Sequence, residues 1–357
     1  MNKKVVHIVG ARPNFIKAAP VLHALKHYPN ITQELVHTGQ HYDEKMSSIF
    51  FDVLEMPKPT INLGIGSSKH HGEQIGKALI KLEKFFIDSN PDLVIVYGDV
   101  NSTLAGALAA VKLGIKLAHV EAGLRSFDLS MPEEINRMLV DRITNYNFVT
   151  EHSGLVNLNC ENIDEDKVFF VGNTMIDSLL KIFKLISHDS SLTKYALLTF
   201  HRPSNVDNEE GIRKILEICK HIDMSVVFPI HPRTKNKFKE YGLYEELESL
   251  PRVTLRDPVG YMEFVEMMKN SSVVITDSGG IQEETTVLGV PCLTLRDNTE
   301  RPITVVSGTN LLVKNIEDIA YNIDLIKKGA FKKASIPHLW DGKAGQRIAE
   351  IINKELN

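Results

Sequence analysis

The sequence predicts an α/β protein with two doubly wound domains, each built on a mostly parallel sheet. Short apolar, β-branched runs alternate with longer segments of helical period along most of the chain. The pattern starts afresh after Val168-Phe169-Phe170-Val171-Gly172, so we expect one domain over residues 1–168 and a second over 169–357. A length of 357 residues also exceeds that of one usual compact domain.

The first domain begins with an apolar run, which ends at Gly10-Ala11-Arg12-Pro13. Pro132 suits the first position of a later helix, and Glu133 and Glu134 suit its first turn, where the helix dipole favours acids. The expected strands are residues 4–9, 35–37, 93–97 and 116–120, and the expected helices are 14–27, 43–53, 72–88, 102–112 and the one that begins at Pro132.

The second domain repeats the theme, with no Gly/Ser-rich linker before it, so we expect close docking of the two domains. The expected strands are 196–200, 226–230, 273–276, 292–295 and 311–313, and helices are expected at 261–269 and 316–327. A last helix over about 343–354 is left with two placements, on the second domain or back on the first.

Polar clusters follow the predicted strands directly. Ligands of parallel α/β sheets bind at the carboxyl ends of the strands, so these clusters are the candidate site residues. The five clusters are Gly10-Ala11-Arg12-Pro13, Gly98-Asp99, Glu121-Ala122-Gly123, His201-Arg202 and Asp277-Ser278-Gly279-Gly280.

Composition excludes several classes of function. A net charge of −4 gives no global reason to bind nucleic acid or an anionic membrane, so a polyanionic ligand needs a local cluster of donors. No apolar stretch approaches the about 20 residues of a membrane span, and the 3 cysteines are far apart. We therefore expect a cytoplasmic protein with reduced thiols. Neither GxGxxG nor GxxxxGK[ST] occurs, which removes the main support for dinucleotide and P-loop binding.

A phosphate seat is predicted at Ser278, Gly279 and Gly280, between a strand and a helix. Free backbone N–H groups and the helix dipole favour anions there, although an ordinary turn has the same pattern. Glu283 and Glu284 in the following helix suit ribose hydroxyls. Arg12 and Lys17, after the first strand, suit phosphate oxygens.

Asp99, Glu121 and Glu133 are three carboxylates expected near one rim of the first sheet. Grouped carboxylates separate one another's pKa values, which suits acid–base catalysis; Mg²⁺ binding, helix capping and pairing with Arg137 are the alternatives. His201 is a candidate proton donor or phosphate partner. The remaining histidines lack companions at metal-ligand spacing, so no metal site is predicted.

Seven motifs, in order along the chain, resemble the non-hydrolysing UDP-N-acetylglucosamine 2-epimerase family. They are Gly-Ala-Arg-Pro (10–13), Tyr-Gly-Asp-Val-Asn-Ser-Thr (97–103), His-Val-Glu-Ala-Gly-Leu-Arg (119–125), Met-Pro-Glu-Glu-Ile-Asn-Arg (131–137), Val-Gly-Asn-Thr (171–174), Asp-Ser-Gly-Gly-Ile-Gln-Glu-Glu (277–284) and Arg-Asp-Asn-Thr-Glu-Arg-Pro (296–302). Asn14 departs from the family, where many members have Glu.

The resemblance implies a GT-B-like fold, with two Rossmann-like domains and an active site in the interdomain cleft. It implies reversible conversion of UDP-GlcNAc to UDP-ManNAc through 2-acetamidoglucal, without cofactor or metal, by a homodimer.

The resemblance also implies roles for individual residues. Asp99, Glu121 and Glu133 become acid and base, and His201 assists the departure of UDP. Arg137 becomes a sugar-site residue. The residues implied for the UDP moiety are Arg12, Lys17, Ser278, Gly279, Gly280 and Glu284.

Four other functions remain as alternatives. A sister epimerase acts on UDP-2,3-diacetamido-2,3-dideoxy-glucuronic acid, and Asp-Pro-Val-Gly-Tyr (257–261) resembles that subgroup. A hydrolysing epimerase, which releases free ManNAc, would need only an active site that excludes water less completely. A GT-B glycosyltransferase would need an acceptor surface, for which the sequence shows no apolar or basic patch. A non-catalytic sensor would gain nothing from three clustered carboxylates.

Overall fold

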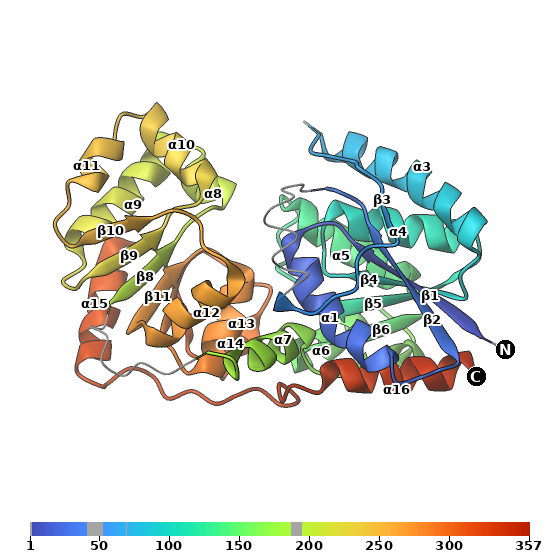
Figure 1. Cartoon of the computed structure of the whole chain (residues 1–357). Helices are drawn as coiled ribbons and strands as arrows, with labels where there is room; N and C mark the ends of the chain where they lie inside the picture. The colour runs from blue at the N-terminus through green and yellow to red at the C-terminus, as the bar shows by residue number, and fades with distance from the viewer. Residues whose placement is uncertain (1, 41–52, 69, 187–194) are drawn as a thin grey trace. The chain divides into compact units, whose positions relative to one another are not determined.

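The computed structural model describes residues 2–40, 53–68, 70–186 and 195–357. These residues form two compact units (Figure 1). Unit 1 comprises Met1–Ile182 together with His338–Asn357, and unit 2 comprises Phe183–Pro337. None of the helices in these ranges is long and apolar enough to cross a membrane.

Unit 1 is built on a seven-stranded parallel sheet of order β3-β2-β1-β4-β5-β6-β7. Its strands are β1 (Lys3–Val9), β2 (Ile31–His37), β3 (Ile61–Asn62), β4 (Leu93–Tyr97), β5 (Lys116–Ala122), β6 (Tyr146–Val149) and β7 (Val168–Phe170). Every residue of β4 is buried, as its unbroken apolar sequence predicts for a central parallel strand. The strand order reverses between β1 and β4, which is where ligands bind in open α/β sheets.

Most described helices of unit 1 match predicted ones, but the helices His152–Cys160 and Thr174–Phe183 were not predicted. In α3 the buried residues Gln74, Ala78, Leu82 and Phe86 recur every fourth position and face the sheet. The helices are α1 (Arg12–Leu25), α3 (His71–Ser89), α4 (Asn101–Lys112), α5 (Pro132–Ile143), α6 (His152–Cys160), α7 (Thr174–Phe183) and α16 (Ala344–Leu356). Residues 43–52 of the helix predicted at 43–53 lie outside the described ranges.

Unit 2 has a six-stranded parallel sheet of order β10-β9-β8-β11-β12-β13, which reverses between β8 and β11. Its strands are β8 (Ala196–Thr199), β9 (Val226–Pro229), β10 (Val253–Arg256), β11 (Val273–Thr276), β12 (Cys292–Leu295) and β13 (Asn310–Val313). Its helices are α8 (Pro203–Val206), α9 (Glu209–His221), α10 (Pro232–Glu240), α11 (Tyr244–Glu248), α12 (Tyr261–Asn270), α13 (Gly279–Leu288), α14 (Pro302–Val306) and α15 (Ile316–Lys327).

The chain leaves unit 1 later than the predicted boundary at residue 168. β7 pairs in parallel with β6, so its hydrogen bonds keep it in the first sheet, and α7 follows it. The chain then returns at His338, and α16 packs along α1 (Figure 1). At their contact a Cβ on Gly345 would lie 2.7 Å from the backbone of Pro20, so only glycine permits this approach. Of the two placements left open for the last helix, the structure shows the one on the first unit.

Candidate active site

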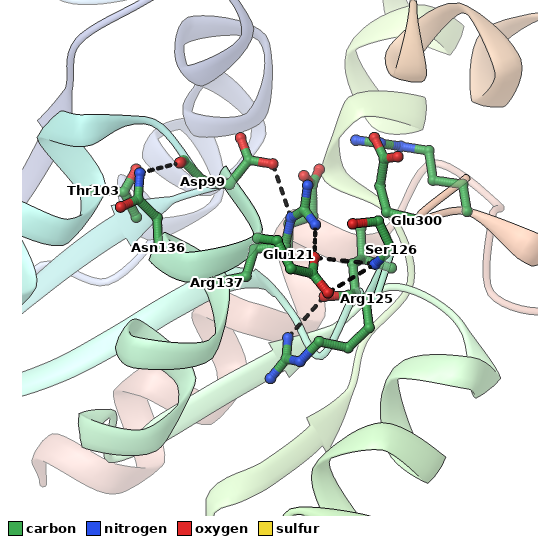
Figure 2. A network of polar contacts seen from close by, with 12 residues as sticks. Asp99, Thr103, Glu121, Arg125, Ser126, Asn136, Arg137 and Glu300 are labelled. Atoms are coloured by element: carbon green, nitrogen blue, oxygen red, sulfur yellow. Dashed lines mark hydrogen bonds and ion pairs between the residues drawn. The ribbon is translucent and has the colours of Figure 1, made fainter. Parts of the chain in front are cut away.

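In unit 1 the turn after β4 carries Asp99. Gly98 precedes it with φ +61°, a conformation that glycine adopts without strain. The Asp99 carboxylate accepts a hydrogen bond of 3.0 Å from Nε of Arg137, which projects from α5 (Figure 2). The Asp99 carbonyl accepts another from Nδ2 of Asn136, at 2.8 Å. Asp99 is therefore held at both its backbone and its side chain by neighbouring residues of α5.

Glu121 lies at the end of β5, where the register with β6 shifts between Val120 and Ala122. Its φ of +79° is unusual for a residue with a side chain. The carboxylate is buried and accepts a 2.7 Å hydrogen bond from Nζ of Lys17, which is also buried. A Cβ on Gly98 would lie 2.9 Å from that Nζ and 3.7 Å from Oε1 of Glu121. Glu121 and the turn that carries Asp99 are therefore neighbours.

α5 presents two adjacent acids with different surroundings. Glu134 is buried and accepts hydrogen bonds from the backbone N–H groups of Ser126 and Phe127 and from Arg137. Glu133 is half-buried and makes no hydrogen bond or ion pair with any residue that the structure describes. Glu134 therefore stabilises the turn at residues 126–127, whereas Glu133 is not engaged by the residues that the structure describes.

Asn14 closes the turn between β1 and α1. Its Oδ1 accepts from the backbone N–H groups of Gly10 (3.0 Å) and Ala11 (3.1 Å), and its Nδ2 donates to the carbonyl of Tyr97 (2.8 Å). The amide thus joins the ends of β1 and β4 at the switch point. Arg12 begins α1, and its side chain lies outside what the structure describes.

In unit 2 the corresponding strand ends are joined by Asp277, which follows β11. Its buried carboxylate accepts from the backbone N–H groups of His201 and Arg202 and lies 3.2 Å from Nδ1 of His201. Burial would raise the pKa of Asp277, but the His201 ring and the surrounding N–H donors together hold it below its ordinary value. The ring of His201 is partly exposed, and its Nε2 has no hydrogen-bond partner among the described residues.

The predicted phosphate seat is the N-terminus of α13. Ser278 is the residue before the helix, and Gly279 and Gly280 form its first turn. A Cβ on Gly279 would lie 2.5 Å from Nη1 of Arg301 and 2.7 Å from Oε1 of Glu300. Glycine therefore lets two charged side chains approach the helix N-terminus.

Glu284, predicted as the ribose contact, is buried in α13 and accepts a 2.5 Å hydrogen bond from the Tyr261 hydroxyl. Beside it, Glu283 pairs with Nε of Arg301 at 3.0 Å. Glu300 pairs with both Arg301 and Arg296. The ion pairs therefore form a continuous chain in which carboxylates and guanidinium groups alternate. Of this buried network only Glu283 was named from the sequence as a candidate ligand residue. The pairing of Glu283 with Arg301 was not predicted, because the two residues lie on different segments of the chain.

Lys17 and Arg137, predicted to meet substrate, are both engaged with carboxylates within unit 1. From the sequence, Asn14 was given no role, Asp277 was included only as a member of a strand-end cluster, and Glu134 was named only as an acid of a first helical turn. Part of their role could have been recognised from the sequence. A polar side chain beside a strand end that becomes buried needs hydrogen-bond partners, and the backbone N–H groups of a neighbouring turn can supply them.

The fold defines the general class. Two Rossmann-like units with parallel sheets make this a GT-B-like α/β protein. A crystal structure of the UDP-GlcNAc 2-epimerase of Methanocaldococcus jannaschii, in complex with UDP-GlcNAc and UDP, matches it with a TM-score of 0.90 at 45% identity. That match covers 98% of this chain and 99% of the other.

Sequence comparison defines the family. The family model for UDP-N-acetylglucosamine 2-epimerase matches residues 23–353. The M. jannaschii UDP-N-acetylglucosamine 2-epimerase is 46% identical over 98% of both chains. The UDP-2,3-diacetamido-2,3-dideoxy-D-glucuronate 2-epimerase of Pseudomonas aeruginosa is 39% identical over 98% of this chain and 99% of its own. The chain belongs to the UDP-N-acetylglucosamine 2-epimerase family and is an enzyme of the isomerase class.

Proposed function

We propose that this enzyme interconverts UDP-GlcNAc and UDP-ManNAc by eliminating UDP and adding it back. A carboxylate base removes the proton at C2 of the sugar. The C–H electron pair forms a C1=C2 double bond, and the C1–O bond breaks with its electrons going to UDP. The product of this half-reaction is 2-acetamidoglucal. A proton delivered to the opposite face of C2 and return of the UDP oxygen to C1 complete the inversion.

Three carboxylates of unit 1 carry this proposal: Asp99 after β4, Glu121 at the end of β5 and Glu133 in the first turn of α5. Arg137 and Lys17 hold Asp99 and Glu121 in position, and Glu133 has no hydrogen-bond or ion-pair partner in the described part of the chain. A base and a separate acid are needed because C2 loses and regains its proton on opposite faces. Proton transfer by positioned side chains of this kind contributes about 10²–10⁴-fold to rate.

Unit 2 supplies the groups that suit UDP. The N-terminus of α13, with Ser278, Gly279 and Gly280, offers backbone donors to the diphosphate. His201 is oriented through Nδ1 by Asp277, which leaves Nε2 to donate to the departing UDP oxygen. Glu284 is proposed for the ribose hydroxyls, and Arg12 and Lys17 of unit 1 for the anionic leaving group.

No metal or nicotinamide enters the proposed steps. We also propose that the enzyme acts as a homodimer in the cytoplasm, as the family resemblance implies.

UDP-GlcNAc is favoured as the substrate over UDP-2,3-diacetamido-2,3-dideoxy-glucuronic acid. The relative named for UDP-GlcNAc is 46% identical to this chain, and the relative named for the diacetamido sugar is 39% identical.

The test is proton NMR of the purified enzyme with UDP-GlcNAc in D₂O, without added metal or nicotinamide. Formation of UDP-ManNAc with deuterium at C2 is the expected result. Free ManNAc with UDP would instead identify a hydrolysing enzyme. No reaction with UDP-GlcNAc, but turnover of UDP-2,3-diacetamido-glucuronic acid, would overturn the substrate assignment.

Glu133→Gln extends the test to the acid–base role. We expect kcat to fall on the order of 10²-fold or more with KM little changed. Glu73→Gln is the matched control, because Glu73 also lies in the first turn of a helix, α3, but is exposed. Equal kcat values for the two variants would remove Glu133 from the mechanism.

A further inference from the structure

Two histidines of unit 1 are completely buried in the same sheet, and their partners differ in kind. His7 on β1 contacts the hydroxyl of Tyr97 at 2.7 Å and Oε1 of Gln33 at 3.1 Å. A hydroxyl can donate or accept, so a neutral ring satisfies both contacts. Burial accordingly lowers the pKa of His7 to about 3, although the Gln33 hydrogen bond opposes the shift.

His119 on β5 instead faces an acceptor at each ring nitrogen. Nδ1 lies 2.6 Å from Oδ1 of Asp141, and Nε2 lies 2.8 Å from the carbonyl oxygen of Gly98. A neutral imidazole has one N–H and one lone pair, so one contact would set a lone pair against an oxygen. With the ring fully buried, water cannot relieve that repulsion.

The surrounding charges balance only when His119 is protonated. Oδ2 of Asp141 accepts from Nη1 of Arg125 at 2.7 Å and from the backbone N–H of Gly123 at 3.0 Å. Arg125 also holds Glu161 with two hydrogen bonds, of 2.7 and 2.8 Å. The two carboxylates thus face two cations, Arg125 and the imidazolium. Burial favours protonation of Asp141, but His119 and Arg125 outweigh it and lower the pKa of that carboxyl.

We infer that His119 is a buried imidazolium that, with Asp141, positions both Asp99 and Glu121 for the reaction. The argument for positioning rests on the acid–base roles proposed above for Asp99 and Glu121. The protonation state does not depend on those roles.

The contacts reach both carboxylates through the backbone. Nε2 of His119 fixes the carbonyl of Gly98, the residue before Asp99. Asp141 fixes the N–H of Gly123, two residues after Glu121. Glu121 lies between His119 and Gly123 in the left-handed region, a conformation that persists only where its surroundings impose it. One ion pair therefore restrains the backbone on which both candidate acid–base groups sit.

The first experiment is ¹⁵N NMR of the unaltered enzyme labelled at histidine. We expect both ring nitrogens of His119 to carry protons, because each faces an oxygen acceptor. His7 serves as the internal reference for a buried neutral ring. His119 is assigned by comparison with His119→Gln, or by its through-space contacts to Asp141. A neutral tautomer at His119 would overturn the inference.

The second experiment separates kcat from KM. His119→Gln and Asp141→Asn should each lower kcat on the order of 10²-fold while KM changes little, because the reacting groups are displaced but substrate binding is retained. The double variant should lose little more than either single one, because the pair acts as a unit. His7→Gln is the control for altering a buried histidine of this sheet. Unchanged kcat in folded His119→Gln would refute the positioning role.

The two proposals fail in distinguishable ways. If the unaltered enzyme does not epimerise UDP-GlcNAc, the proposed function fails. The NMR test of His119 protonation is independent of that result. If epimerisation occurs and the NMR shows a neutral His119, only the inference about His119 fails.

Discussion

Glu121 combines a left-handed backbone with a buried charge, and each feature is unfavourable by itself. A non-glycine residue at such a φ costs on the order of 1–3 kcal/mol. The negative charge of the Glu121 carboxylate is compensated by Nζ of Lys17 at 2.7 Å. Both side chains are about 5% exposed or less. Strain of this kind at a strand end is typical of functional sites, which supports a role for Glu121 in catalysis.

Lys17→Met should reveal how far Glu121 depends on its cation. Removing one partner of a buried ion pair is destabilising by about 3–5 kcal/mol, because the other charge is left uncompensated. We therefore expect a lower Tm and a lower kcat, measured by calorimetry and steady-state kinetics. Lys77→Met breaks the exposed Lys77–Glu73 pair of α3 and should change stability by less than about 1 kcal/mol. Similar losses in the two variants would contradict this account.

Individual site residues could be predicted from the sequence where position alone decides them. Asp99 and Asp277 follow fully apolar strands, and the carboxyl ends of such strands are shared by neighbours. The partner of Lys17 could not be predicted, because it depends on a residue 104 positions away and on the irregular end of β5. Glu133 and Glu134 are equivalent in the sequence, and only the fold of the 126–127 turn distinguishes them.

At the scale of elements, two strands that are buried throughout, Leu93–Tyr97 and Val273–Thr276, were predicted with their correct bounds from their β-branched and apolar sequences. β6 (Tyr146–Val149) is equally buried but was missed. β10 was missed because Val253–Arg256 alternates between half-buried and exposed residues. β3 has two exposed residues and carries almost no pattern. Short or partly exposed strands such as β3 and β10 are therefore harder to predict than strands with a continuous apolar sequence.

A substitution at the N-terminus of α13 tests the proposed phosphate seat. Gly279→Ala would place a Cβ 2.5 Å from Arg301 and 2.7 Å from Glu300, so these charged groups must shift. We expect the Kd for UDP, measured by calorimetry, to rise about tenfold or more, by analogy with other misplaced binding groups. Gly76→Ala in α3 is the control, since nothing lies within 4 Å of its Cβ position. Alanine there should stabilise the helix by up to about 1 kcal/mol. Unaltered UDP affinity in Gly279→Ala would contradict the seat.

The start of α16 depends on Asp177 of α7, whose carboxylate accepts from the backbone N–H groups of Ala344 (3.2 Å) and Gly345 (2.7 Å). Burial raises the pKa of Asp177 from 3.8 to about 6, against the effect of these hydrogen bonds. Since the folded state then holds the proton more tightly than the unfolded state, this group stabilises the fold most below about pH 3.8. That contribution is lost as the pH rises to about 6.

Asp177→Asn should remove this pH dependence. Between about pH 4 and about pH 6 the free energy of unfolding of the unaltered enzyme should fall, relative to the variant, on the order of 2–3 kcal/mol. Above about pH 7 the difference should be constant. Urea unfolding across this pH range measures the effect, and parallel curves for the two proteins would refute it.

At the scale of the whole molecule, the repeated α/β pattern was sufficient to predict two units but not where the chain crosses between them. β7 looks like the start of a new domain because it is a short apolar strand after a long helical region. Its hydrogen-bond partner β6 decides otherwise. The return of α16 to unit 1 depends on packing against α1, which no local pattern records. The cleft expected between the two domains stays a prediction.

Ending the chain after Lys343 should destabilise unit 1 selectively. This truncation removes α16, whose buried Ile348, Ala349 and Ile352 face unit 1. Hydrogen exchange should show faster exchange in α1 and β1, while β8 and β11 of unit 2 keep their protection. Deletion of Asn357 alone, an exposed residue, is the control. Equal loss of protection in both units would show that they do not unfold independently.

The division of unit 1 into two stretches of chain has a consequence for its synthesis. A ribosome makes residues 1–182 before unit 2 and makes α16 only after unit 2. Until α16 has emerged, the face of α1 that it covers lacks this helix, whereas unit 2 is a continuous segment and can fold as soon as it has emerged. The unit with the carboxylates, although begun before unit 2, is therefore completed after it.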